Sequence, residues 1–315
     1  MIEFLVRRVL VLVPVLFVMS IIVFGLLRLI PGDPVDVMMG SDQVDAETRQ
    51  ALRHELGLDL SLPHQYLRWL GRVGRGDLGR SVRNRESVVA LIADKLPKTL
   101  LLATASALVA LMVALPLGIL AAVRRNSAAD YAAMVFALLG VSVPNFWLGI
   151  LFVLAFAVGL GWLPSQGYAS LIVHPGQALQ YLVLPALTLG LAMAGVVTRM
   201  VRSSVLEAIG QDYVRTARAK GLSERGVVWK HALKNALIPT VTVVGLQFGT
   251  LLGGAVVVEQ VFSWPGIGWL VVHSIFARDY PVVQGVTLVV GVLFVVINTT
   301  VDVLYSVLDP RVRVA

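Results

Sequence analysis

The chain has 315 residues, of which 57% are hydrophobic and only 14% are charged, and its mean hydropathy is +0.82. A soluble globular domain carries about 25% charged residues, so this composition excludes an ordinary soluble protein and indicates a membrane protein. The net charge of +7 is interpreted as a matter of membrane topology rather than of nucleic-acid binding, and the lack of cysteine excludes disulfides, zinc–thiolate sites and cysteine nucleophiles.

Six apolar runs are long enough to cross about 30 Å of hydrocarbon. They predict an all-α, polytopic membrane protein with six transmembrane helices. The first run exceeds the apolar length of a signal peptide and no small-x-small cleavage site follows it, so we expect it to stay as a membrane anchor. The fourth is the weakest, because Pro185 interrupts it. The predicted spans are 9–30, 99–123, 131–158, 180–199, 236–258 and 283–307.

A polar insertion, residues 31–98, separates the first two predicted spans. Asp45 is expected to cap a short helix that stops at Gly57. A second helix is expected near Pro63, where aromatic residues mix with arginines as in helices at a membrane–water interface. A third, near 86–96, is expected to lead through Pro97 into the second span. The insertion is either a cap packed on the spans or a docking surface for an extracytoplasmic partner.

The long 31–98 loop carries many arginines but exceeds the length over which charges are counted for topology. In the shorter connections, lysine and arginine are unevenly divided between the two sides of a six-span bundle. The 159–179 connection has none, and 259–282 has only Arg278. Cytoplasmic loops are enriched in these residues, so the basic side, which carries both termini, is expected to be cytoplasmic. Its basic residues are Arg7, Arg8, Arg124, Arg125, Arg199, Arg202, Arg215, Arg218, Lys220, Arg225, Lys230, Lys234, Arg311 and Arg313.

Ionisable side chains are scarce inside the predicted spans. A transporter driven by an ion gradient normally binds its coupling ion to buried carboxylates or histidines at mid-membrane, so the scarcity indicates that energy is supplied from elsewhere. The polar candidates for a translocation path are Asn145, Gln247, Glu259 and Asn298. Asn145, Gln247 and Asn298 each suit an interhelical hydrogen bond better than a substrate contact.

The sequence contains no recognised catalytic motif. It lacks His-Glu-x-x-His for zinc, Gly-x-Ser-x-Gly for a nucleophile turn and Gly-x4-Gly-Lys-Ser/Thr for a phosphate loop. None of the five histidines pairs with another four residues away. We therefore expect a non-catalytic chain that binds no cofactor or metal and does not hydrolyse ATP by itself.

A basic, polar segment lies between the fourth and fifth predicted spans. Asp212 is expected to cap a short helix, Lys220 to lie in its last turn, and Gly221 to stop it. Tyr213, Val214 and Ala217 would form an apolar edge, opposite Arg215 and Arg218. The residues proposed to act here are Tyr213, Val214, Arg215, Thr216, Ala217, Arg218, Ala219, Lys220 and Gly221.

A second helix is expected to follow this segment directly. Ser223 can cap it, and it would run through Trp229 towards Pro239. The pattern is helix, glycine turn, helix, with a basic exposed side. It is either a solvated loop or an amphipathic element that fits a groove of a partner protein, and the compact caps favour the second interpretation.

Several motifs in the same order along the chain resemble permease subunits of binding-protein-dependent ABC importers, and in particular the dipeptide/oligopeptide/nickel branch. Tyr213–Gly221 followed by His231–Pro239 is similar to the cytoplasmic coupling loop of that family. The wider superfamily has Glu-Ala-Ala before its glycine, where this chain has Arg215-Thr216-Ala217, as is usual for the peptide branch. The other matching motifs are Pro31–Pro34, Leu56–Asp59, Gly76–Gly79, Phe262–Gly268 and Leu308–Arg313.

The resemblance implies a role within an assembly in the bacterial cytoplasmic membrane. Residues 1–315 would form one transmembrane domain with a coupling loop at 200–235. It would pair with a homologous second permease and with two cytoplasmic ATPases, which bind ATP and Mg and receive the 213–221 helix. A substrate-binding protein would dock outside, over part of 31–98 and 259–282. The implied cargo is di- or oligopeptide, and the alternative function is a secondary transporter or channel not driven by ATP.

Overall fold

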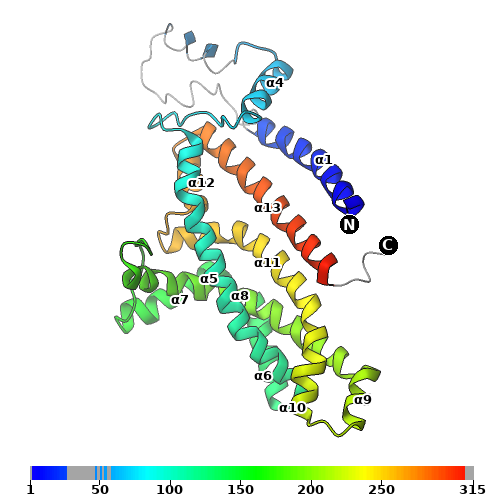
Figure 1. Cartoon of the computed structure of the whole chain (residues 1–315). Helices are drawn as coiled ribbons and strands as arrows, with labels where there is room; N and C mark the ends of the chain where they lie inside the picture. Colours follow the sequence, from blue (N-terminus) through cyan, green and yellow to red (C-terminus); the bar gives the residue numbers. More distant parts are fainter. Residues whose placement is uncertain (1, 27–46, 48–49, 52, 55–57, 309–315) are drawn as a thin grey trace. The chain divides into compact units, whose positions relative to one another are not determined.

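The computed structural model describes residues 2–26, 47, 50–51, 53–54 and 58–308. Among these residues every named element is a helix, which agrees with the predicted all-α class (Figure 1). The chain forms two compact units, one from Met1–Pro97 with Trp269–Val295 and the other from Lys98–Gly268 with Val296–Ala315. The elements are α1 (Ile2–Leu26), α4 (Leu62–Val73), α5 (Val88–Val123), α6 (Ala128–Ser142), α7 (Asn145–Phe152), the π-helical η1 (Val153–Gly159), α8 (Pro175–Ile209), α9 (Asp212–Ala219), α10 (Glu224–Gly226), the π-helical η2 (Val227–Ala232), α11 (Leu233–Val261), α12 (Ile267–Phe276) and α13 (Tyr280–Leu308).

An apolar cluster holds α4 against α1 and α13 in the first unit. Its buried members are Val23, Phe24, Trp69 and Leu288. Helix α4 starts after Ser61 with a proline in its first turn, where the missing N–H of proline would have no helical partner anyway. It ends at Val73, and Gly74 is its C-cap residue. The helix predicted near Pro63 is confirmed. Of the helix predicted between Asp45 and Gly57, both ends lie outside the described residues.

The helix predicted near 86–96, leading through Pro97 into the second span, is confirmed. Helix α5 begins at Val88 and continues without a break to Val123. It therefore merges that helix with the second predicted span. Next to its start, Asp279 accepts hydrogen bonds from the Ser81 hydroxyl and from the backbone N–H of Val82.

Helix α8 is the most buried of the long apolar helices in the second unit, and it packs against α6, α7 and α11. Glycines allow the closest of these approaches. A Cβ added to Gly195 of α8 would lie 2.6 Å from the carbonyl oxygen of Ala137 and 3.4 Å from the Cα of Gly140, both on α6. Small residues at such a crossing bring the two backbones together.

We expect Gly195→Ala to destabilise the second unit, because even one methyl group meets the α6 backbone and overpacking costs about 1–3 kcal/mol. Gly176→Ala is the matched control, since Gly176 lies on the same helix and an added Cβ would meet nothing within 4 Å. The measurement is the thermal unfolding midpoint of the detergent-purified protein. A Gly195→Ala midpoint equal to that of Gly176→Ala would show that the crossing of α6 and α8 does not require glycine at position 195.

The third predicted span, 131–158, is not one helix. Helices α6 and α7–η1 are bent by 104° at a short break. Val143 there has the extended backbone angles φ −82° and ψ 124°, which the following Pro144 favours by clashing with a helical conformation of the residue before it. Pro144 itself is the N-cap residue of α7.

Pro185 has the opposite outcome. The fourth predicted span was judged weak because of this proline, but α8 runs through it and is 35 residues long. Among the described residues, four helices and one bent pair are long and apolar enough to cross a membrane. The first predicted span contributes only Leu12–Gly25 to this comparison, and residues 27–30 of it lie outside the described range. Six spans therefore stay a prediction.

Candidate functional site

Helix α9 forms where the sequence placed a short polar helix, with a shift at its start. The N-cap residue is Gln211, with extended backbone angles, and Asp212 is the first helical residue. The prediction that Asp212 caps the helix is wrong by one position. Its carboxylate still lies in the first turn, where a negative charge interacts favourably with the helix dipole.

The end of α9 is a tight glycine turn. Gly221 has φ +78°, in the left-handed region that only glycine adopts at little cost. Its N–H donates to the carbonyl of Arg218 at 2.9 Å, and the N–H of Leu222 donates to that of Ala217 at 3.4 Å. These two bonds define a Schellman motif, with Gly221 immediately after the C-cap residue Lys220. The predicted role of Gly221 as the helix stop is confirmed.

One side of α9 is buried and the other faces outward. Val214 and Ala217 are buried, and α9 contacts η2. Tyr213 was expected on the same apolar edge, but its side chain is 40% exposed. Helix geometry explains the difference, because adjacent residues point about 100° apart and only a narrow edge fits against η2.

The chain turns back into the bundle directly after Gly221. The Ser223 hydroxyl accepts a hydrogen bond from the N–H of Gly226 at 3.3 Å, which confirms its predicted capping role. From there α10 and η2 lead into α11. Trp229 on η2 is 58% exposed, so two aromatic side chains, Trp229 and Tyr213, lie on the surface of this region.

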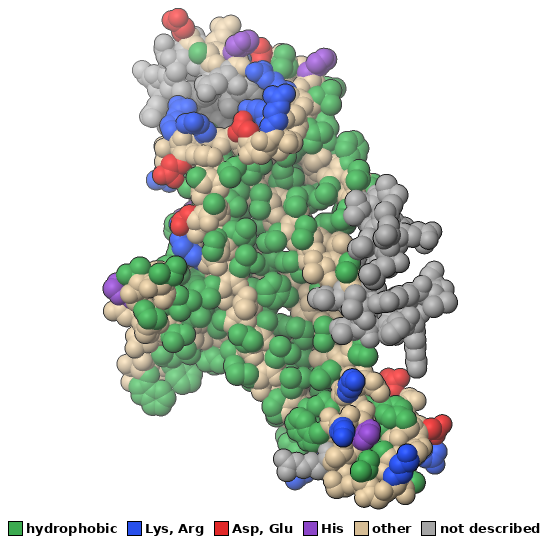
Figure 2. Space-filling view, in the orientation of Figure 1, with side chains coloured by type: hydrophobic (Ala, Val, Ile, Leu, Met, Phe, Trp, Pro, Cys, Tyr) green, Lys and Arg blue, Asp and Glu red, His purple; other side chains and the backbone are tan. Residues whose placement is uncertain are grey.

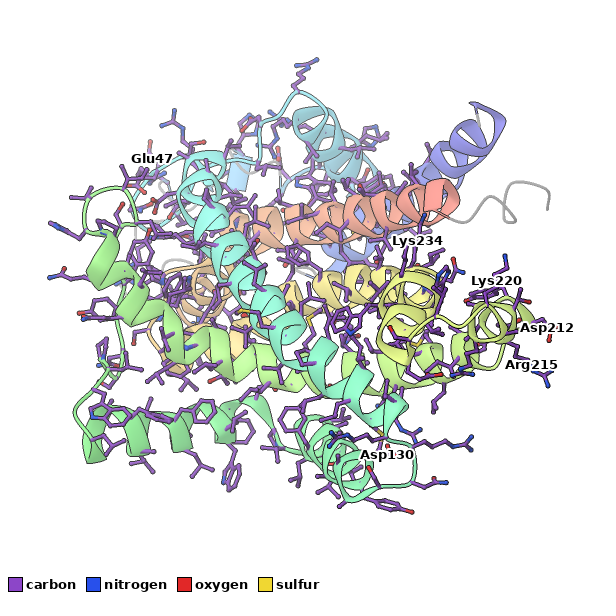
Figure 3. All side chains as sticks on the ribbon, turned by 60° about the horizontal axis from the view of Figure 1, so that its bottom comes forward. Glu47, Asp130, Asp212, Arg215, Lys220 and Lys234 are labelled. Atoms are coloured by element: carbon purple, nitrogen blue, oxygen red, sulfur yellow. The ribbon has the colours of Figure 1, made fainter. Side chains whose placement is uncertain are left out.

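The outward face is mixed in charge. Asp212, Arg215 and Lys220 project away from α9 (Figure 3), and Thr216 and Ala219 are also exposed. Charged and histidine side chains gather over α9 and the neighbouring turns (Figure 2). The site is a short rigid helix that presents a polar face with aromatic side chains at its border, and among the described residues no group of three metal-ligating side chains accompanies it.

An ion pair bridges the glycine turn. Arg218 donates from Nε to Glu224 Oε1 at 2.7 Å and from Nη2 to Oε2 at 3.2 Å. The hydrogen bond from Arg218 lowers the pKa of Glu224 below its usual value. The pair therefore contributes stability above the ordinary pKa of glutamate and loses it as the pH falls through the lowered value, so it is intact at neutral pH.

We expect Glu224→Gln to speed hydrogen exchange of the Gly221 and Leu222 amides at neutral pH, because the bridge that holds their turn is weakened. The effect should be small, since exposed ion pairs contribute little. Asp212→Asn is the control, because Asp212 approaches Arg215 only to 3.5 Å and both are largely exposed. Equal exchange in the two variants would show that the bridge does not stabilise the turn.

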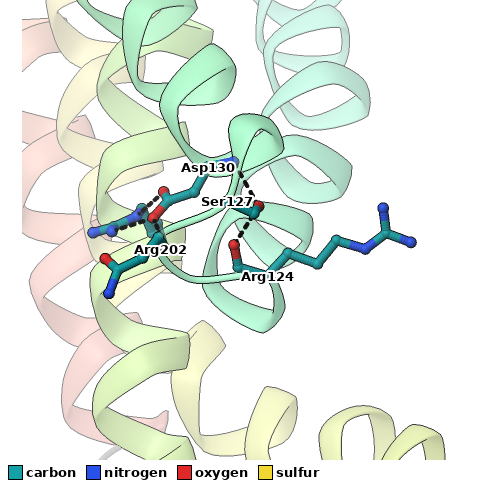
Figure 4. Close-up of polar contacts among 5 residues, drawn as sticks. Arg124, Ser127, Asp130 and Arg202 are labelled. Carbon is teal, nitrogen blue, oxygen red and sulfur yellow. Dashed lines mark hydrogen bonds and ion pairs between the residues drawn. The ribbon is translucent and has the colours of Figure 1, made fainter.

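A second ion pair near the same end of the unit was not predicted from the sequence. Arg202 of α8 donates from Nε and Nη2 to the two oxygens of Asp130 at 2.5 and 2.7 Å (Figure 4). The Asp130 side chain is only 3% exposed, and the N–H of Asn126 donates to it at 3.0 Å. Ser127 caps α6, and the Ser127-x-x-Asp130 spacing is the one local signal that could have drawn attention to Asp130.

The position of this pair connects it with α9. Arg202 lies seven residues before the end of α8 at Ile209, and α9 starts three residues after that end. The ion pair that joins α8 to the start of α6 therefore lies about two turns before the end of α8. Only two residues, Gly210 and Gln211, separate the surface helix α9 from this buried helix.

The four candidates for a translocation path have different environments. Asn145 is half-buried at the start of α7, and Gln247 is half-buried on α11. The buried Oδ1 of Asn298 has no hydrogen-bond partner among the described residues. Gln247 and Glu259 are twelve residues apart on one helix, which is about 18 Å. The structure therefore does not bring all four into one site.

Glu259 is fully buried and belongs to a small network of hydrogen bonds. Its Oε1 accepts a hydrogen bond from the hydroxyl of Thr99 at 2.6 Å, and Thr99 in turn accepts from the N–H of Ile267 at 2.8 Å. Trp264 donates from its indole to the carbonyl of Lys98 at 3.0 Å. This carboxylate therefore ties α11 to α5, a packing role that the sequence did not predict for it.

Comparisons with known proteins agree along the whole chain. The family described as "Binding-protein-dependent transport system inner membrane component" matches residues 114–314, and its N-terminal companion family matches residues 1–103. The chain is similar to the di/tripeptide transport system permease protein DppB of Pseudomonas aeruginosa, with 44% identity over 99% of both chains. It is also 44% identical over 99% of both chains to the glutathione transport system permease protein GsiC of Escherichia coli. A putative peptide transport system permease of Brucella abortus is 46% identical over 98% of both.

The fold is similar to that of a solved transporter. Two structures of the inward-facing MetNI methionine ABC transporter match 70% of this chain and 96% of theirs. The TM-scores are 0.58 and 0.59, at 22% and 21% identity. At this level of identity the match concerns the fold alone.

Proposed function

Because the chain belongs to the family of binding-protein-dependent transport system inner membrane components, it is a permease subunit of an ABC importer, and we propose that its cargo is di- and oligopeptides. The observation that carries the cargo is the 44% identity, over 99% of both chains, with a protein named a di/tripeptide permease. A relative of the same identity is named for glutathione, itself a tripeptide derivative. The alternative of a secondary transporter or channel is set aside by the family assignment.

The proposed coupling element is the α9 segment, residues 213–221. Its support is physical: it is short, closed at its C-terminal end by the Gly221 turn, and packed through Val214 and Ala217. Its other face carries Arg215 and Lys220 outward (Figure 3), and Tyr213 is 40% exposed. A cytoplasmic ATPase that bound this face more tightly in one state than in another would shift the permease between its states, and only such a difference in contacts can do so.

The rest of the assembly follows from that role. Two ATPase subunits would bind and hydrolyse ATP with Mg, so that this chain needs no cofactor of its own. A homologous permease would supply the other half of the path. The chain is a multi-pass protein of the bacterial inner membrane, and both termini are proposed to be cytoplasmic. Residues 1–315 would act as one transmembrane domain, with the insertion 31–98 outside and the coupling loop 200–235 inside.

A substrate-binding protein is proposed to dock on the outer side. Support comes from the turn before α5, which is fixed by the hydrogen bonds of Ser81 and Val82 to Asp279. Arg80 and Arg83 belong to the same turn and are both exposed. A rigid basic turn can steer and orient a partner with acidic surface residues.

The experiment is uptake of radiolabelled di- and tripeptides into proteoliposomes. They would contain this chain with its partner permease, ATPases and binding protein, and ATP would be enclosed on the ATPase side. Peptide accumulation that needs both ATP and the binding protein is the expected result. Uptake that persists without ATP under a proton gradient would refute the ATP-driven mechanism, whereas ATP-driven uptake of another solute but not of peptides would refute the cargo alone.

A further inference from the structure

Helix α4 lies unusually close to the apolar part of α1. The hydroxyls of Tyr66 and Ser20 are 2.8 Å apart and hydrogen bonded. Ser20 is six residues before the end of α1 at Leu26, which is about 9 Å along the helix. The ring of Tyr66 also packs edge-on against Phe17 and Phe24. Tyr66 therefore lies at the level of residues 17–24 of α1 rather than beyond its end.

That level of α1 is apolar on its outward faces too. Val18, Ile21 and Ile22 are about half exposed at the same height as Ser20, and the helix belongs to a multi-pass membrane protein. Exposed isoleucine and valine on such a helix normally contact lipid. Because α4 lies at the same level as these residues of α1, its exposed side is expected to meet lipid acyl chains as well.

The surface of α4 has three parts: a packed side, an exposed apolar edge and an exposed basic side, as a helix at the edge of the hydrocarbon layer would need. Tyr66, Trp69 and Leu70 belong to the packed side that meets α1 and α13. Leu67 is 63% exposed beside them. Arg68 and Arg72 are exposed about 200–240° around the helix from Tyr66. Arginine and histidine side chains are visible on the part of the first unit that carries α4 (Figure 2).

We propose that α4 is an interfacial membrane helix, with Leu67 in contact with acyl chains and Arg68 and Arg72 bound to the phosphates of lipid headgroups. Helices that lie in the interface have this arrangement of apolar edge and basic face, and arginine binds phosphate through paired N–H donors. The hydrogen bond between Tyr66 and Ser20 and the aromatic cluster fix the depth. The proposal also removes α4 from the surface available to the substrate-binding protein and leaves the turn at Arg80–Arg85 for it.

The absence of cysteine from the sequence makes a direct test possible. Leu67→Cys and Arg68→Cys would each be spin-labelled in the complete transporter, reconstituted in vesicles of phosphatidylethanolamine and phosphatidylglycerol. Collision with oxygen, which concentrates in lipid, would be compared with collision with a water-soluble nickel complex. Leu67→Cys is expected to favour oxygen, and Arg68→Cys to favour nickel, although the two positions are adjacent.

An unlabelled variant guards against disturbance by the label. The small thiol of Leu67→Cys should react with a membrane-impermeant maleimide about tenfold more slowly than that of Arg68→Cys, because the reactive thiolate does not form in an apolar environment. Equal access of nickel to both labels would overturn the proposal. It would also be overturned if the Leu67 label avoided both oxygen and nickel and gained access only when the binding protein was removed, since a protein would then cover this edge.

Discussion

Gly221→Pro is expected to abolish peptide uptake while leaving the chain inserted in the membrane. Gly221 has φ +78°, whereas proline is fixed near −65°. The substitution also removes the N–H that donates to Arg218. The Schellman turn cannot form in this variant, so α9 loses its fixed direction relative to η2. Since the change is confined to the surface turn, the spans should still assemble.

The measurement compares uptake at equal membrane abundance of the variant and the unsubstituted chain. A pair of milder variants separates conformation from side-chain size. Gly221→Ala requires alanine in the left-handed region at a cost of about 1–2 kcal/mol, although nothing lies within 4 Å of the added Cβ. Gly210→Ala is the control, because Gly210 has a helical φ of −78° at the end of α8. Normal uptake by Gly221→Pro would contradict the assignment of this turn to coupling.

Asp130→Asn is expected to cause the largest loss of stability among single polar substitutions in the second unit. It removes the charge that pairs with both donors of Arg202. Breaking a buried ion pair from one side costs about 3–5 kcal/mol, and we expect the lower end because Arg202 keeps 24% exposure. The thermal unfolding midpoint of the purified protein should fall, and coupled ATPase activity should fall with it.

A double-mutant cycle tests whether the pair itself is responsible. Asp130→Asn with Arg202→Gln leaves no uncompensated charge, so its loss of stability should be clearly smaller than the sum of the two single losses. Glu207→Gln, at an exposed site on the same helix, should leave stability unchanged. Additive losses in the cycle would mean that the two residues act independently and that the clamp does not fix α8 to α6.

Local chemistry made the surface segment readable from the sequence. Gly221 and Ser223 were assigned their roles from residue type and spacing alone, and both roles are present in the structure. Asp212 was predicted as the N-cap residue but is the first residue of the helix, because Gln211 is the residue with extended backbone angles. A helix start depends on the backbone of one residue, and several polar residues in a row satisfy the same pattern.

The prolines show what the sequence could not decide. Pro144 and Pro185 both lack a backbone donor, but the chain bends by 104° at the first and stays helical at the second. Pro185 is buried among the helices around α8, where neighbours can stabilise a helix that has lost one hydrogen bond. The difference lies in the packing, which a local pattern does not contain.

Contacts between residues far apart in the sequence could not be predicted either. Asp130 and Arg202 are 72 positions apart, and Thr99 and Glu259 are 160 apart. Glu259 was considered for a translocation path because polar and ionisable side chains are scarce in the predicted spans, whereas its hydrogen bond joins α11 to α5. A single sequence contains no signal for either pair, because their meeting depends on how the helices cross.

The outward face of α9 is proposed to contact an ATPase subunit. A photo-crosslink from this face can detect that contact directly. Tyr213 would be replaced by benzoylphenylalanine, a side chain of similar shape, in the complete transporter in membranes. Ile172, which is 94% exposed in the connection before α8, would carry the same group as a control. A covalent product is expected between position 213 and the ATPase subunit, and none from position 172. If the ATPase co-purifies with the chain but position 213 gives no product with it, the assignment of α9 as the coupling helix is contradicted.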